Sequence, residues 1–291
     1  MKLSVIVATR NRDHAIAGCL DSIATSLANA SPLNAEIVVV DNGSEDDTSA
    51  IVNAWAGACP FPVRLVSEPK AGLSRAHNRA LETARGELLA ITDDDCRVSK
   101  EYVSQLLSYD ASDGTELVFR GGRIELGDPS DLPLTIKTTP TRSRWNRRMN
   151  SARHENLGDC FAGCNMTMRR AVVEQLGPFD ERFGPGSVVG SGGDVDYVLR
   201  AYLANITIEY VPDMTVFHYH GRKLQSVGHQ FMQRYMIGSG GLYAKFIFKD
   251  PNLCRPVYWD IKNALKEILS GTNTFLPALG FSHRDKLSIM R

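Results

Sequence analysis

Short apolar runs alternate with amphipathic segments through the first third of the chain. Leu3 to Ala8 is an apolar run bounded by polar residues, and Ile16, Leu20, Ile23 and Leu27 follow it at helical spacing. The same alternation continues, with strands predicted over 36–40, 63–66 and 88–92 and helices over 46–55 and 73–84. Strands that alternate with helices indicate an α/β fold with a mostly parallel sheet flanked by helices.

Polar clusters follow three of these strands, at residues 9–12, 41–44 and 93–95. In a parallel sheet, ligands bind at the carboxyl ends of the strands. We therefore expect the three clusters to converge on one site.

The pattern loosens after about residue 110, where a second lobe or a long loop carries a basic stretch over 137–153. Further on, the spacing predicts helices over 170–176 and 194–203 and two separate strands over 206–211 and 215–219. Two amphipathic segments, about 225–248 and 256–269, follow. We expect one domain over 1–222, with halves 1–110 and 111–222, and a C-terminal helical extension over 223–291.

The composition narrows the class of protein. Hydrophobic residues make up 43% and charged residues 23%, with 33 basic and 33 acidic side chains, which excludes disorder and a nucleic-acid-coating protein. The apolar start of the chain is too short for a signal peptide, and no window reaches the roughly 20 apolar residues of a membrane span. We expect a cytoplasmic protein whose six cysteines are reduced thiols.

Three successive carboxylates, Asp93, Asp94 and Asp95, follow a predicted buried strand. Their mutual repulsion costs stability unless a cation or hydrogen-bond donors compensate it. Carboxylate oxygens suit Mg²⁺ or Mn²⁺, whose remaining ligands would come from phosphate and water. A solvated acidic turn before a helix near Ser99 explains the segment equally well.

Other polar residues have both a structural and a functional interpretation. Asp41 could accept a hydrogen bond from a nucleobase or ribose, or form an Asx turn. Arg75, in the first turn of its helix, could face an anion or be solvated. Asp194 could cap its helix or act as a base, and the helix N-terminus favours its ionised form. His218 and His220 point to one face of a strand and could bind metal or simply pack.

Arginines flank Trp145 in the basic stretch, at positions 142, 144, 147 and 148. They could bind a pyrophosphate or an anionic membrane surface, and a solvated loop is an equally good interpretation.

The order of these motifs resembles that of the family 2 glycosyltransferases over approximately residues 3–220. The motifs are Val5 through Arg12, Val39 through Ser44, Gly72 through Asn78, Asp93 through Asp95, and Gly193-Asp194-Val195-Asp196. The stretch Gly163-Cys164-Asn165-Met166, followed by Gly177-Pro178-Phe179-Asp180, also resembles the segment that precedes the catalytic helix in that family.

The resemblance implies a GT-A fold and an inverting, metal-dependent enzyme that uses a nucleotide-sugar. The implied donor contacts are Thr9, Arg10, Arg12, Asp41, Arg75, Asp93 and Asp94. The implied metal ligands are Asp95 and His218, with His220 as the alternative, and Asp194 is the implied general base. Gly163, Asn165 and Gly193 fall on the implied acceptor side, and Gly193 stands where many relatives carry Glu.

The expected reaction moves a sugar from a UDP-, GDP- or dTDP-linked donor to a hydroxyl of a glycan or lipid-linked acceptor. The expected setting is polysaccharide or cell-envelope biosynthesis, with peripheral association on the inner face of the membrane left open. A non-catalytic nucleotide-sugar-binding or scaffold protein is one alternative. A sugar nucleotidyltransferase is another, although the loop after the first strand lacks the glycines that such an enzyme needs for its phosphates.

Overall fold

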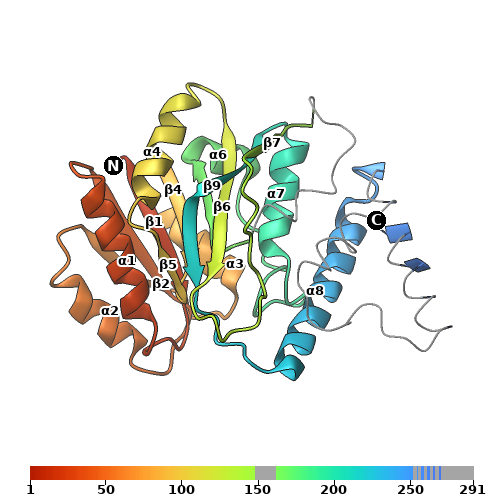
Figure 1. Ribbon diagram of the computed structural model, residues 1–291, viewed down its shortest axis with the longest axis horizontal. Coiled ribbons are helices and arrows are strands. Elements are labelled where there is room, and N and C mark those ends of the chain that lie inside the picture. Colours follow the sequence, from red (N-terminus) through yellow and green to blue (C-terminus); the bar gives the residue numbers. More distant parts are fainter. Residues whose placement is uncertain are drawn as a thin grey trace.

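The computed structural model describes residues 1–147 and 162–251, together with residues 254, 257, 258, 261, 262, 265 and 269. Nine strands of this part of the chain form one sheet with helices on both faces (Figure 1). No helix within it is long and apolar enough to cross a membrane. The mixed, mostly parallel α/β fold predicted from the sequence is confirmed.

The first half of the sheet consists of four parallel strands in the order β3-β2-β1-β4. Their bounds are β1 (Leu3–Thr9), β2 (Ala35–Asp41), β3 (Val63–Ser67) and β4 (Leu88–Asp93). Strands β1, β2 and β4 are almost wholly buried, as expected for a parallel sheet that is covered on both faces.

Helices divide between the two faces of the sheet and create two hydrophobic cores (Figure 1). The helices α1 (Ile16–Asn29), α2 (Thr48–Ala56) and α4 (Tyr102–Ser112) pack on one face. The helices α3 (Leu73–Thr83), α6 (Arg170–Leu176) and α7 (Gly193–Leu203) pack on the other. Because helices cover both faces, the polar ends of the strands are left to form a site at the sheet's edge.

The second half of the sheet is mixed in direction. It contains β5 (Cys96–Val98), β6 (Val118–Leu126), β7 (Ser143–Trp145), β8 (Met166–Arg169) and β9 (Thr207–His218). The prediction of two strands over 206–211 and 215–219 is wrong, because β9 runs without interruption through Pro212 and Asp213. An irregular register between Gly122 and Ile124 of β6 accommodates this segment.

The predicted helix over 225–248 is confirmed as α8 (Gln225–Phe246). Leu242 and Phe246 are buried in the same core as α7. Lys245 contacts Asp196 of α7 and lies 2.7 Å from Asp180. The start of the predicted C-terminal extension is therefore packed against the preceding residues, while most of 252–291 lies outside the described residues.

Candidate active site

A cavity of about 710 Å³ lies where the carboxyl ends of β1 and β4, the end of β9 and the start of α7 meet. Ten of the residues predicted for the site line it: Thr9, Arg10, Arg12, Asp93, Asp94, Asp95, Gly163, Gly193, Asp194 and His218. Asn11, whose backbone N–H donates to Ser44 Oγ at 2.9 Å, ties the first polar cluster to the second. The expected convergence of the three clusters is confirmed.

Arg12 neutralises part of the negative charge of the acidic turn, which consists of Asp93, Asp94 and Asp95. Its Nε donates to Asp94 at 3.0 Å and its second nitrogen, Nη2, donates to Asp95 at 3.0 Å. Burial nevertheless raises the pKa of Asp94 to about 6, and burial together with the Asp95 charge raises the pKa of Asp93 above its ordinary value. One arginine does not compensate three carboxylates, so the turn favours a further cation.

His218 completes a group of possible metal ligands with Asp93 and Asp95, whose ligand atoms all lie within 4.8 Å of one another. Its Nε2 is 3.2 Å from Asp95 Oδ1. Burial alone would raise the pKa of Asp95, but the contacts with His218 and Arg12 lower it below its ordinary value. Two carboxylates and an imidazole are a donor set that fits Mn²⁺ or Mg²⁺.

Thr135 orients the His218 ring. Its hydroxyl donates to Leu134 O at 2.6 Å and lies 3.0 Å from His218 Nδ1. Because the hydroxyl proton is used by Leu134, the hydroxyl oxygen accepts a hydrogen bond from Nδ1–H of His218. A proton on Nδ1 leaves the Nε2 lone pair for a metal, and such a second partner is usual for a ligating histidine.

His220 does not line the cavity, and its ring is hydrogen-bonded to other residues. Its Nε2 is 3.0 Å from Leu132 O and its Nδ1 accepts the Arg222 N–H at 3.0 Å. Because both ring nitrogens have partners, the geometry favours His218 over His220 as the ligand.

Asp194 lies in the first turn of α7, but Gly192 is the residue that precedes the helix. The Asp194 carboxylate accepts the N–H of Gly163 and the N–H of Val195, each at 2.9 Å. The N–H donors favour the ionised form, as expected at a helix N-terminus, but the net shift of the pKa differs from that expectation. Burial outweighs these donors and raises the pKa of Asp194, which makes the carboxylate a stronger base.

Three predicted site residues, Asp41, Arg75 and Asn165, do not line the cavity. Asp41 accepts the Ser44 N–H at 2.8 Å and contacts the Ser49 hydroxyl, so it forms the turn that was its structural interpretation. Arg75 pairs with Glu181 at 2.7 Å. Neither arrangement supports the expected donor contact.

Asn165 is fully buried and supports the fold, contrary to the expected acceptor contact. Its amide donates to Arg123 O and Met214 O at 3.0 and 2.9 Å, and its carbonyl accepts the Tyr102 hydroxyl. These bonds use its hydrogen-bonding groups to join β6, β9 and α4.

Among the cavity residues that the sequence interpretation missed, His77 and Arg222 each have a polar atom without a partner among the described residues. His77 lines the cavity from α3, its Nε2 has no hydrogen-bond partner among the described residues, and burial lowers its pKa to about 4. Arg222 also lines the cavity, with an Nη1 that lacks a partner in the same part of the chain. An unsatisfied buried polar atom in a cavity is costly unless a ligand pairs with it.

The departure from the family pattern at Gly193 has a steric reason. A Cβ at this position would lie 2.9 Å from Ser74 Oγ and 3.5 Å from the Gly184 backbone. No side chain fits there unless Ser74 moves, so the missing Glu reflects close packing between α7 and the loop at Gly184.

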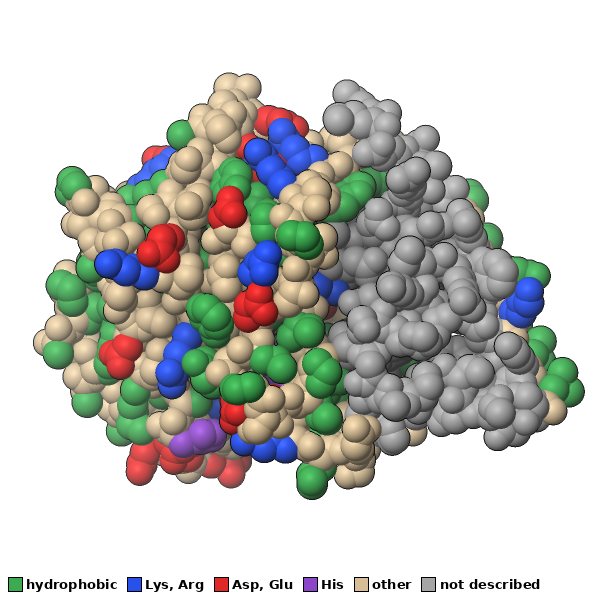
Figure 2. All heavy atoms as spheres, viewed as in Figure 1, with side chains coloured by type: hydrophobic (Ala, Val, Ile, Leu, Met, Phe, Trp, Pro, Cys, Tyr) green, Lys and Arg blue, Asp and Glu red, His purple; other side chains and the backbone are tan. Residues whose placement is uncertain are grey.

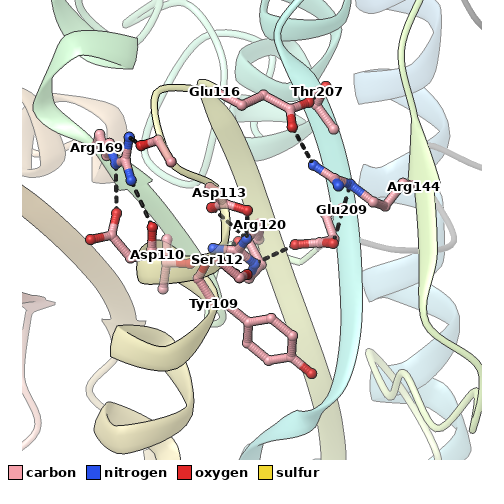
Figure 3. Close-up of polar contacts among 12 residues, drawn as sticks. Tyr109, Asp110, Ser112, Asp113, Glu116, Arg120, Arg144, Arg169, Thr207 and Glu209 are labelled. Carbon is pink, nitrogen blue, oxygen red and sulfur yellow. Dashed lines mark hydrogen bonds and ion pairs between the residues drawn. The ribbon is translucent and has the colours of Figure 1, made fainter.

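Two arginines of the basic stretch are neutralised within the fold. Arg142 pairs with the buried Glu209. Arg144 pairs with Glu209 and, at 2.9 Å, with Glu116 (Figure 3). Arg148 lies outside the described residues. On the face in Figure 2, acidic and basic side chains are interspersed. The arrangement does not support the interpretation of Arg142 and Arg144 as a free anion-binding patch.

Comparison with known proteins agrees with the fold. The chain is 26% identical over 240 residues to the glycosyltransferase AglE of Haloferax volcanii, covering 82% of this chain and 72% of that protein. It is also 26% identical over 248 residues to the succinoglycan biosynthesis protein ExoM of Rhizobium meliloti, covering 76% and 75%.

Two solved structures have a similar fold. The mannosyltransferase PcManGT from Pyrobaculum calidifontis, in complex with GDP-Man and Mn²⁺, superposes with a TM-score of 0.61 and 21% identity, covering 88% of this chain and 69% of that chain. TarS 1-349 from S. aureus, in complex with UDP-GlcNAc, gives a TM-score of 0.55 at 21% identity, covering 75% and 58%.

The GT-A fold and these relatives define an enzyme of the glycosyltransferase class. The family model described as glycosyl transferase family 2 matches residues 4–177, which is more than half of the 291 residues. The chain belongs to glycosyl transferase family 2.

Proposed function

We propose that this chain transfers a sugar from a nucleoside diphosphate sugar to an acceptor hydroxyl with inversion at the anomeric carbon. The observation that carries the proposal is the shared cavity, in which the Asp93, Asp95 and His218 group lies with Asp194. A metal site and a separate carboxylate base are the two parts that such a displacement needs.

Asp95 and His218 would hold Mg²⁺ or Mn²⁺, and Asp93 would contact the metal, the ribose or the donor sugar. When bound, the ion would neutralise charge that grows on the departing diphosphate. Arg222 would contact the diphosphate, because its Nη1 has no partner among the described residues. His77 would supply from α3 the polar donor contact that was expected of Arg75.

Asp194 would be the general base. As the acceptor oxygen attacks the anomeric carbon, its proton passes to the Asp194 carboxylate and the bond from sugar to diphosphate breaks. A single displacement inverts the anomeric configuration. The N–H groups of Gly163 and Val195 fix the carboxylate, and its raised pKa suits it to accept this proton.

The acceptor would be a glycan or a lipid-linked glycan in cell-envelope or polysaccharide biosynthesis. The names of two relatives support this class: the succinoglycan biosynthesis protein ExoM, and the bactoprenol glucosyl transferase of Shigella phage SfV, which is 28% identical over 202 residues. The latter alignment covers 68% of this chain and 62% of that protein.

A donor screen tests the proposal. The purified chain is incubated with UDP-, GDP- and dTDP-sugars, with Mn²⁺, Mg²⁺ or EDTA, and release of nucleoside diphosphate is measured. Water takes the place of the acceptor hydroxyl in this assay, so the release follows hydrolysis of the donor. We expect release with one donor group, abolished by EDTA and by Asp95→Ala. No release with any donor would favour a binding or scaffold role, and pyrophosphate release from a nucleoside triphosphate would favour a nucleotidyltransferase.

A further inference from the structure

Two buried cysteines lie directly beside the proposed metal ligands. The antiparallel pairing of β5 with β9 places Cys96 opposite His218, and Cys164 reaches the same point from the turn before β8. The two cysteine side chains are 1% and 2% exposed. Both are free thiols.

These thiols form a second group of possible ligands around the same imidazole. The two sulfur atoms and a His218 ring nitrogen all lie within 4.8 Å of one another. Asp95 Oδ1 is 3.8 Å from Cys96 Sγ and 3.2 Å from His218 Nε2, so it can supply a fourth ligand.

The distances are close to those of a tetrahedral site. Ligand atoms bound to Zn²⁺ at about 2.0 to 2.3 Å lie roughly 3.3 to 3.8 Å apart. The group, whose ligand atoms lie within 4.8 Å of one another, therefore needs to contract by at most about 1.5 Å. Two thiolates, an imidazole and a carboxylate are a donor set that Zn²⁺ and Cd²⁺ prefer, whereas Mn²⁺ and Mg²⁺ prefer oxygen.

We propose that Cys96, Cys164 and His218 form a sulfur-containing site for a thiophilic divalent ion, and that this ion excludes the ion held by Asp93, Asp95 and His218. One imidazole nitrogen cannot bind both ions, so occupation of the two sites is mutually exclusive. The ion reaches the thiols through the cavity, which both Cys164 and His218 line. Zn²⁺ then acts as an inhibitor that competes with the activating metal.

The chemistry of the donor atoms explains how the two ions are discriminated. A metal ion must displace the proton of a thiol before it can bind the sulfur. Thiophilic ions form strong bonds to thiolate and drive this exchange, whereas Mn²⁺ does not. With oxygen-preferring metals the two cysteines therefore remain neutral packing residues.

Cadmium binding tests the site directly. The reduced, metal-free chain of 291 residues is titrated with Cd²⁺, and the ultraviolet absorption of cadmium–thiolate bonds is followed. We expect one ion per chain and an affinity loss of at least about 100-fold in Cys96→Ser and in Cys164→Ser, since even an outer partner of a ligand is worth 10- to 100-fold. Cys19→Ser is the matched control, because this thiol is equally buried and also lies near the acidic turn but outside the group.

A thiolate band of equal strength in Cys96→Ser and Cys164→Ser, or no band in the wild type, would overturn the proposal. If a serine variant does not fold, the cadmium-113 resonance of the wild type decides, since sulfur ligands shift it away from the position of oxygen-only sites. We expect a sulfur-containing site, and an oxygen-only resonance contradicts it.

Competition is measured by adding Zn²⁺ to Mn²⁺-loaded protein and following free Mn²⁺ by electron paramagnetic resonance. We expect stoichiometric release from the wild type and from Cys19→Ser, and release only at far higher Zn²⁺ from Cys164→Ser. Simultaneous retention of both ions overturns the exclusion. This arm rests on the proposed function, and the cadmium arm does not: cadmium–thiolate bonds without Mn²⁺ binding would contradict only the proposed Mn²⁺ site.

Discussion

Asp94 makes the stability of the metal-free protein depend on pH. Its side chain is buried, and burial raises its pKa from 3.8 to about 6 despite the contact with Arg12. The folded state thus binds this proton more tightly than the unfolded chain. Its contribution to the free energy of unfolding is fully present below about pH 4 and is lost as the pH rises through about 6.

The size of the effect follows from the shift. Two pKa units correspond to about 3 kcal/mol, which is the stability lost at pH 8 relative to acid pH. Between pH 5 and pH 8 the loss is about 1 to 2 kcal/mol, because pH 5 lies one unit below the folded-state value. Asp93, whose pKa is also raised, adds to the loss in the same direction.

Urea unfolding in EDTA at pH 5 and pH 8, for the wild type and Asp94→Asn, measures this contribution. The wild type should lose about 1 to 2 kcal/mol more than the variant between the two pH values. Mn²⁺ with UDP should stabilise the wild type more at pH 8 than at pH 5, because a cation binds the ionised carboxylates. Equal pH dependence in the wild type and Asp94→Asn would refute the reasoning.

Three further predictions concern the fold and the ligands. Glu209→Gln should destabilise the protein by about 1.5 to 3 kcal/mol in urea unfolding, because the buried Arg120 loses a charged hydrogen-bond partner and keeps the carboxylate of Asp113 (Figure 3); an unchanged midpoint would contradict this. Lys245→Met should speed amide hydrogen exchange in α8, because Asp196 loses the cation that joins α8 to α7, and unaltered exchange would count against this anchor. His218→Gln should weaken Mn²⁺ binding at least about tenfold by calorimetry, and full affinity would remove His218 from the site.

The sequence was sufficient for the first half of the fold, because long buried strands and amphipathic helices have clear periodicities. Two later strands could not be predicted from the sequence. Strand β8 has only four residues, too few to show a periodicity, and the Gly121-Gly122 pair of β6 is typical of a turn. Pro212 and Asp213 read as a break for the same reason. In β9 this break is tolerated because the neighbouring strand changes register there.

For the site, the acidic turn and Asp194 could be located from their places at a strand end and a helix start. The side of α3 that faces the cavity could not be predicted from the sequence. Arg75 and His77 are two residues apart, which is about 200° around a helix, so only one of them can face the cavity. The tertiary packing decides for His77. The pKa of Asp194 was likewise inaccessible, because it depends on burial by segments distant in sequence.

The central claim is that Asp194 is the base of a sugar transfer whose donor is held by other residues. It is tested most directly by the turnover number of Asp194→Asn at saturating donor, with UDP affinity measured on the same preparation. The account predicts UDP affinity within about twofold of the wild type and turnover lower by about 10² to 10⁴-fold. Turnover close to that of the wild type would contradict it.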